Sequence, residues 1–419
     1  MKVYKFGGAS VRDAAGIVNL GGIVSLEKGD MVIVVSAFGK TTNALEKLLR
    51  EWTIGNSEYK KTLDDITGYH NNVMQELFPV CNPVINDVHE AFKNLGYHLG
   101  SLPSGDYDMD YDQIVSYGEI WSTLIVAGYL GTIIPGVRWK DIRKLLITDD
   151  RYRDANINWE ESYNRICKEF NFRNERMYVT QGFIGGNADG YSTTLGREGS
   201  DYTAAVIANM LDAESVTVWK DVPGILNADP KWMADANKLD ELSYKEAVEM
   251  TFSGAKVIHP KTIKPLHNKN IPLHVKSFLA PGLPGTIIKN DPEIRTVIPH
   301  FIKKEDQMLI SILPTDFSFV MGDNLSRIFS YFSDRGIKVN LVEASAVSID
   351  VCINDEREKV NSFIEDLKPE FTIVYNENVE LLTIRHYTEP SITKLTEGRE
   401  ILLEQRTRTT IRFVVRAQG

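Results

Sequence analysis

The chain has 419 residues, 43% of them hydrophobic and 25% charged, which is typical of a globular protein with two or three domains. Its net charge of −10 with no basic run argues against nucleic acid as a partner, and no apolar run approaches the roughly 20 residues that span a bilayer. Three scattered cysteines and an N-terminus without a signal-peptide core predict a soluble, cytoplasmic protein that binds neither nucleic acid nor membrane.

Strand and helix signals alternate at the start of the chain. A short strand is predicted at 2–6 (KVYKF), a helix at 11–26, and a strand buried on both faces at 31–38 (MVIVVSAF). Cap residues and helix formers then predict a helix that begins at Thr41. Because helices follow strands in turn, the pattern predicts an α/β fold, with a mostly parallel sheet covered on both faces.

Helical signals follow at 58–100 and 113–130, and the alternation of strands and helices then returns until about residue 280. In this stretch the predicted elements are a strand and turn at 176–186, a helix at 200–213, a strand at 214–222 and a helix at 242–258. The segment 279–292 (LAPGLPGTIIKNDP) is rich in Pro and Gly, which is typical of a domain edge.

The C-terminal part has a different order of elements. Strands are predicted at 308–315 and over two stretches of 337–354, helices at 323–336 and 357–367, and a further strand from 371. This β-α-β-β-α-β order is typical of a ferredoxin-like α+β module. A strand-rich tail follows.

The stretch VYKFGGAS places Lys5, Gly7 and Gly8 at the end of a predicted strand. Glycines let backbone N–H groups approach a phosphate, and the lysine adds positive charge. The alternative is a tight turn with a solvated lysine.

The stretch TTLGREGSD places Arg197, Ser200 and Asp201 where a turn runs into a helix. A helix N-terminus favours an anion, a guanidinium can grip a carboxylate, and an aspartate can accept from an ammonium group. These residues could therefore hold both charged ends of an amino acid. The alternative is a capped surface turn in which Arg197 pairs with Asp201.

Other charged residues lie near the predicted ends of helices and strands. Glu119 is either a carboxylate near a helix start or an acceptor for an ammonium group in a cleft. Asp221 follows a strand, where α/β proteins bind ligands, and Lys231 follows the next turn. The acidic run 106–112 lacks the Gly and Glu of a calcium loop and is predicted to be a solvated turn. His259 is predicted to be a packed or surface histidine and not a catalytic one.

Taken together, these motifs resemble the aspartate kinase family of the amino-acid kinase superfamily. The matching stretches occur in the family's order and cover nearly the whole first domain. They are VYKFGGASV (3–11), VVSAFGKTTNAL (34–45), SYGE (116–119), GFIGGNADGYSTTLGREGSDYTAA (182–205), WKDVPGILNADPK (219–231) and FSGAKVIHPKTI (252–263). The resemblance implies a three-layer αβα kinase domain at 1–290 and an ACT regulatory region at 300–419. A first ACT module is expected at about 305–378 and a shortened second one at about 379–419, with little room for its first helix.

The resemblance also implies the roles of the site residues. Catalytic roles fall to Lys5 and Asp201. Aspartate binding falls to Thr42, Glu119, Arg197, Ser200 and Asp201, and ATP binding to Lys5, Phe6, Gly7, Gly8, Lys220, Asp221, Leu226, Lys231, Lys256 and Val257. An amino-acid effector would contact Asp323, Asn324, Val339, Asn340 and Ser345. No resident metal site is expected.

By this resemblance the chain would use ATP with Mg²⁺ to phosphorylate the side-chain carboxylate of L-aspartate, the first step of lysine, threonine and methionine biosynthesis. It would be feedback regulated and form a homo-oligomer through its ACT modules. The alternatives are a related kinase acting on glutamate or N-acetylglutamate, and a non-catalytic ACT sensor of amino acids. The chain departs from the family at Leu226, where an aromatic residue is common, and at Asn340 and Ala346, where acids are common.

Overall fold

The computed structural model describes residues 1–79, 81–255, 258–290, 298–316, 318–320 and 322–416, and these form two units. The first unit contains Met1–Ile225, Lys238–Val248 and residues 258–290. The second contains Leu226–Asn237, residues 249–255 and the described residues from 298 onward. The predicted domain ranges 1–290 and 300–419 stay predictions, and the units differ from them chiefly in the placement of 226–237.

An eight-stranded sheet forms the centre of the first unit, in the order β3-β4-β2-β1-β7-β9-β10-β8. All neighbouring pairs are parallel except β9 and β10. The prediction of a mostly parallel α/β sheet is therefore confirmed. The elements that run from the N-terminus to residue 290 are β1 (Lys2–Phe6), α1 (Ala14–Ser25), β2 (Met31–Val35), α2 (Thr41–Thr53), α3 (Glu58–Leu77), α4 (Pro83–Leu99), α5 (Tyr107–Ile133), β3 (Val137–Lys140), a 3-10 turn (Ile142–Lys144), α6 (Trp159–Glu169), β4 (Met177–Gln181), β5 (Ile184–Gly186), β6 (Ser192–Thr194), α7 (Gly199–Met210), β7 (Ser215–Lys220), β8 (Glu241–Ser243), α8 (Tyr244–Ser253), α9 (Pro260–Asn268), β9 (Leu273–Ser277) and β10 (Thr286–Lys289).

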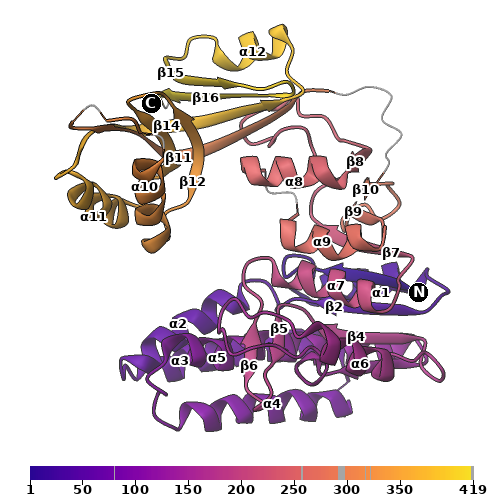
Figure 1. Ribbon diagram of the computed structural model, residues 1–419. Helices are drawn as coiled ribbons and strands as arrows, with labels where there is room; N and C mark the ends of the chain where they lie inside the picture. The colour runs from indigo at the N-terminus through magenta and orange to yellow at the C-terminus, as the bar shows by residue number, and fades with distance from the viewer. Residues whose placement is uncertain (80, 256–257, 291–297, 317, 321, 417–419) are drawn as a thin grey trace. The chain divides into compact units, whose positions relative to one another are not determined.

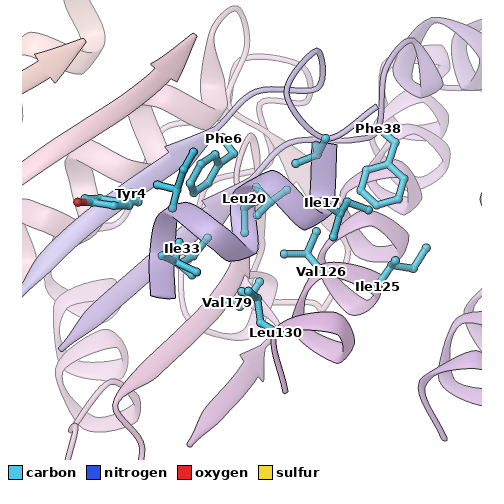
Figure 2. Packing of buried hydrophobic residues seen from close by; sticks show 14 of the residues in the cluster. Tyr4, Phe6, Ile17, Leu20, Ile33, Phe38, Ile125, Val126, Leu130 and Val179 are labelled. Carbon is cyan, nitrogen blue, oxygen red and sulfur yellow. The ribbon is translucent and has the colours of Figure 1, made fainter. Parts of the chain in front are cut away.

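The main core lies between the central strands and the helices α1 and α5. Tyr4 and Phe6 of β1 meet Leu20 of α1 and Val126 of α5 there, and all four side chains are buried (Figure 2). Because alternate strand residues point to opposite faces, Val3 of β1 faces the other layer, where α7 packs on β1, β2 and β7. The sheet is thus held between two helical layers, and each fully buried aliphatic side chain contributes roughly 1.5–3 kcal/mol.

Several predicted elements differ in extent from the sequence interpretation, among them the following three. The strand predicted at 31–38 ends at Val35. The helix predicted at 242–258 divides into β8 and α8, which ends at Ser253. The helix predicted from Gln113 begins at Tyr107, because the Asp106 carboxylate caps it by accepting from the N–H groups of residues 108 and 109.

The second unit contains a six-stranded sheet in the order β12-β13-β11-β14-β16-β15. Its first module has the predicted β-α-β-β-α-β order, and α10 and α11 cover one face of it (Figure 1). The unit's elements are β11 (His300–Pro314), α10 (Asp323–Asp334), β12 (Val339–Ala344), β13 (Ile349–Asn354), α11 (Arg357–Leu367), β14 (Phe371–Arg385), α12 (Glu389–Thr396), β15 (Ile401–Arg406) and β16 (Thr410–Arg416).

Two long strands serve both modules of this unit. The first part of β11, from His300 to Lys304, pairs with the last part of β14, and that part of β14 pairs with β16. With β15 this gives a second four-stranded set in the order β15-β16-β14-β11. The expectation of little room for a helix in this module was wrong, because α12 fits between β14 and β15 with a Thr388 capping box.

The segment 226–237 packs against the second module. Trp232 and Met233 join a cluster with Leu382, Ile384 and Phe413 of β14 and β16. This apolar contact explains why a stretch from the middle of the chain belongs to the second unit. Separately, none of the helices in the described residues has the length and apolar character needed to cross a membrane.

Candidate active site

A cavity of about 580 Å³ opens in the first unit at the carboxyl ends of β1, β2 and β7. Lys5 and Gly7 come from the end of β1, Ser36 follows β2, and Lys220 and Asp221 end β7. Open α/β sheets bind their ligands at this edge. The loop before α7 and one face of α5 complete the walls.

Two lysines and a buried aspartate form the charged floor of the cavity. The Nζ atom of Lys5 lies 2.7 Å from Oδ1 of Asp201, and Nζ of Lys220 lies 3.9 Å from Oδ2. Burial would raise the pKa of Asp201, but the charges of Lys5 and Lys220 outweigh it and hold that pKa below its usual value. Asp201 is therefore an anion that fixes both ammonium groups toward the cavity.

Gly7 and Gly8 have different physical reasons to be glycine. A Cβ atom on Gly8 would lie 2.6 Å from the carbonyl oxygen of Ala37, so only glycine lets these two loops approach. A Cβ on Gly7 would meet Nζ of Lys5 at 3.5 Å, an ordinary contact. Gly8 thus joins the loops after β1 and β2, while Gly7 keeps the space beside the Lys5 ammonium open.

The loop before α7 runs through two left-handed residues. Gly196 has φ 76° and Glu198 has φ 54°, and α7 begins at Gly199. Ser200 and Asp201 thus lie in the first turn, as predicted, and the Ser36 hydroxyl donates to that of Ser200 at 3.0 Å. The Arg197 side chain is exposed at the cavity wall and has no hydrogen bond or ion pair with any described residue.

The Arg197–Asp201 pair that the capped-turn interpretation required is absent, because Asp201 pairs with the two lysines instead. A guanidinium at a helix N-terminus without an internal partner is suited to a carboxylate from outside the protein.

Glu119 lies in the middle of α5 and not near a helix start, so the interpretation as a helix-start carboxylate was wrong. Its side chain is 3% exposed and lines the cavity. Oε1 accepts from the N–H of Ala37 at 3.3 Å, whereas Oε2 is buried and has no partner among the described residues. Burial raises the pKa of Glu119 to about 8. An incoming ammonium group would satisfy Oε2 and restore the charge.

The acidic run 106–112, predicted to be a solvated turn, instead supports the cavity. Asp112 is buried and accepts from the N–H of Thr194 at 2.7 Å, from the Thr194 hydroxyl at 2.7 Å and from the N–H of Arg153 at 3.0 Å. Burial raises its pKa to about 6. Tyr111, Arg153, Thr194 and Phe183 also line the cavity and were not among the predicted site residues. Phe183 and Thr194 lie within the motif 182–205, whereas no local motif marks Tyr111 or Arg153.

Not every predicted ligand-binding residue meets at this cavity. Thr42 lines it, but the Phe6 side chain is fully buried and stacks on Trp219 at a centroid distance of 6.0 Å, so only its backbone remains for a ligand. Leu226 and Lys231 belong to the second unit. Lys256 and Val257 lie outside the described residues. His259 is the N-cap of α9, and its side chain accepts from the N–H of Lys261.

The predicted effector residues all lie in the first module of the second unit. Asp323 and Asn324 begin α10, Val339 and Asn340 lie in β12, and Ser345 follows it. Asn340 is buried, and its amide donates to Gln307 at 2.7 Å and to Asn354 at 2.8 Å. Its side chain is therefore already engaged within the protein, and the effector role stays a prediction.

Comparisons with known proteins bear on the family of this chain. Residues 1–277 match the Amino acid kinase family. The chain is similar to lysine-sensitive aspartokinase 3 of Escherichia coli (strain K12), with 32% identity over 349 residues that cover 83% of this chain and 77% of that protein. It is also similar to a chloroplastic bifunctional aspartokinase/homoserine dehydrogenase of Arabidopsis thaliana, at 28% identity over 382 residues, and spans 42% of that longer protein.

A solved structure of an aspartokinase has a similar fold. The chain superposes on E. coli aspartokinase III in complex with aspartate and ADP (R-state) with a TM-score of 0.84 and 27% identity. The match covers 99% of this chain and 96% of that one.

Proposed function

Because this chain belongs to the amino acid kinase family and, within it, to the aspartokinases, it is an aspartate kinase, and we propose that the cavity described above is its active site. The reaction transfers the γ-phosphoryl group of ATP to the side-chain carboxylate of L-aspartate and gives 4-phospho-L-aspartate and ADP. This step precedes the synthesis of lysine and threonine.

The unpartnered Oε2 atom of Glu119 is the observation that carries this assignment. Aspartate has one ammonium group and two carboxylates. In our proposal the ammonium group pairs with Glu119 and the α-carboxylate with Arg197, while the hydroxyls of Thr42 and Ser200 orient the side chain. The side-chain carboxylate then faces Lys5, which also contacts the transferred phosphoryl group.

The chemistry needs no general base, because the unperturbed pKa of an aspartate side chain is about 4 and the nucleophile is ionised at neutral pH. A carboxylate oxygen attacks the γ-phosphorus, and the bond to the bridging oxygen of ADP breaks. Lys5 opposes the negative charge of the transferring group, and Asp201 acts on catalysis by holding Lys5 and Lys220 in place. Rate enhancement thus comes from alignment and charge neutralisation.

We propose that the nucleotide enters as MgATP and lies against the backbone at Gly7 and Gly8, with Lys220 and Asp221 beside it. Leu226, Lys231, Lys256 and Val257 stay predicted nucleotide contacts. For regulation, we propose an amino-acid effector at the first module of the second unit, near Asp323, Asn324, Val339 and Ser345. A homo-oligomer formed through this unit also stays a prediction.

A coupled assay of ADP release tests the proposed function. L-Aspartate, L-glutamate and N-acetyl-L-glutamate are compared at equal concentration with MgATP, and lysine, threonine and methionine are then added singly. We expect turnover with L-aspartate at least tenfold above the other two acceptors, since a longer chain would displace the attacking carboxylate. Preference for a glutamate substrate would favour a related kinase, and no ADP release at all would favour an amino-acid sensor.

A further inference from the structure

A second guanidinium lies at the wall of the cavity and has no role in the reaction as described so far. Arg153 lines the cavity together with Arg197, from the turn that precedes α6. Lys5 and Lys220, the other two cations there, both pair with Asp201. Arg197 has no ion pair with any described residue, and Arg153 has only an exposed pair with Asp108, so the two arginines are the cations of the cavity best placed to bind a carboxylate of the substrate.

The backbone at Arg153 is held in an unusual conformation. Its φ is 66°, in the left-handed region that glycine adopts freely and that an arginine enters only at a cost. The buried carboxylate of Asp112 accepts from its N–H at 3.0 Å and also from Thr194. An arginine kept where glycine would fit more easily indicates that its side chain is useful there.

The turns that carry the two arginines are joined to each other. A Cβ atom on Gly196 would lie 2.8 Å from Oδ1 of Asp154 and 3.2 Å from the carbonyl oxygen of Arg153, so the loop of Arg197 approaches the turn of Arg153 closely. Asp112 adds a second link, because it binds Thr194 at the start of the same loop. The backbone segments that carry the two arginines are thus held together at one junction.

The Arg153 side chain is positioned by an aromatic ring. Its guanidinium carbon lies 4.5 Å from the centroid of Tyr111, and the Tyr111 hydroxyl donates to Glu46 at 2.9 Å, which fixes the ring. Stacking leaves the N–H groups at the guanidinium edge free to donate. Nη1 lies 3.1 Å from Asp108, an exposed pair of the kind that contributes little and exchanges readily.

We propose that Arg153 is a specificity-determining residue that binds the α-carboxylate of aspartate together with Arg197. The proposal rests on the proposed function of the cavity. Of the two carboxylates of the substrate, one must be free to attack phosphorus, so the other is the natural partner of two arginines. A double guanidinium grip selects acceptors with a charged α-carboxylate and fixes which carboxylate is phosphorylated.

The test compares Arg153→Gly with Arg151→Ala. Glycine removes the guanidinium but accepts the left-handed backbone, so we expect no loss of thermal stability. Arg151 lies two residues away in the same turn and pairs with Asp154, yet it does not line the cavity, which makes it a matched charge control. We expect Arg153→Gly to raise KM for L-aspartate about tenfold, the loss of roughly one charge-assisted hydrogen bond, with KM for ATP unchanged. Arg151→Ala should leave both constants unchanged.

A second acceptor separates recognition from a structural role. L-Isoasparagine keeps the side-chain carboxylate but carries an uncharged α-amide. The ratio of kcat/KM for L-aspartate to that for L-isoasparagine should fall about tenfold in Arg153→Gly, and Arg153→Lys should restore part of it. Equal losses with both acceptors, or an unchanged KM for L-aspartate, would overturn the role of Arg153 and leave the kinase assignment intact. A wild-type protein inactive with L-aspartate would instead remove the proposed function itself.

Discussion

Two buried polar clusters of this protein, one in each unit, differ in how their hydrogen bonds are satisfied. In the cavity of the first unit, the buried Oε2 of Glu119 has no partner among the described residues, and the exposed Arg197 at the cavity wall has no hydrogen bond or ion pair with any of them. In the sheet of the second unit, Asn340 donates to Gln307 and Asn354 and accepts from Nζ of Lys304 at 2.9 Å.

The difference separates a site prepared for a ligand from a network that holds a sheet together. A buried polar atom without a partner costs roughly 1–3 kcal/mol, and a ligand that supplies the partner recovers that cost. A satisfied network gains nothing from an added ligand but loses stability when one member is removed. Substitutions in the cavity should therefore act mainly on kinetics, and those in the sheet cluster mainly on unfolding.

The largest expected effect is that of Lys5→Met. Removing the ammonium group takes away the charge that opposes the transferring phosphoryl group, so kcat should fall about 10²–10³-fold. Asp201 keeps Lys220 as an ionic partner, and circular dichroism should show an unchanged fold. Turnover by Lys5→Met equal to that of the wild type would show that Lys5 has no part in the chemistry.

The next largest effect is the pH dependence of the KM for L-aspartate, which we attribute to Glu119. Only the ionised carboxylate can pair with the ammonium group of the substrate, and the pKa of Glu119 is raised to about 8 by burial. KM for L-aspartate should therefore rise about tenfold for each pH unit below 8. Glu119→Gln should raise KM at pH 8 by about 10–100-fold and abolish this dependence.

Stability gives an independent check on Glu119. The folded-state pKa lies above the ordinary value of 4.5, so the carboxyl group destabilises the fold increasingly as pH rises from 4.5 toward 8. Glu119→Gln removes that cost and should melt at or above the temperature of the wild type at pH 8. A clear loss of thermal stability would mean that Glu119 serves the fold and is not reserved for a ligand.

In the sheet cluster of the second unit, Gln307→Leu should lower stability and leave the kinetics unchanged, the reverse of what is expected for Glu119→Gln. Gln307 is buried, accepts from Asn340 at 2.7 Å and donates to Asn354 at 3.2 Å, so its loss leaves both amides short of a partner. We expect the free energy of unfolding in urea to fall by about 1–3 kcal/mol, with turnover unchanged under conditions where the protein is folded. A kinetic defect without destabilisation would remove the contrast between the clusters.

The smallest expected effect is the pH dependence of stability that Lys304 contributes, since its ammonium group donates to Asn340 of this cluster. Burial, with the nearby charges of Lys338 and Arg412, lowers the pKa of Lys304 to about 8. For a lysine with a depressed folded-state pKa, the cost to the fold is complete below pH 8 and disappears as pH rises toward 10.5. The free energy of unfolding of the wild type should therefore contain a contribution that increases from pH 8 to 10.5. Lys304→Met lacks this contribution, so subtracting its pH profile from that of the wild type should reveal it.

Much of the first unit could be predicted from sequence, because its signals are local. Apolar runs define β1 and β2, and the motif around Arg197 and Asp201 places them at the start of α7. The role of Gly8 as a contact with Ala37 and the true start of α5 could not be predicted, since both depend on neighbours in space.

The parts that escaped prediction depend on contacts between distant segments. Asp112 supports the cavity through residues 41 and 82 positions away, so its carboxylate looked like part of an exposed turn. The segment 226–237 joins the second unit through Trp232 and Met233, a packing that its sequence motif did not indicate. One strand, β11, contributes to two modules, which no local periodicity can show.

A crystal structure of the protein with L-aspartate and a non-hydrolysable ATP analogue tests the assignment most directly. We predict the ammonium group of aspartate beside Oε2 of Glu119, its α-carboxylate at Arg197, and its side-chain carboxylate in line with the terminal phosphate next to Lys5. An empty cavity in the first unit, with aspartate and the nucleotide analogue bound elsewhere, would contradict the assignment.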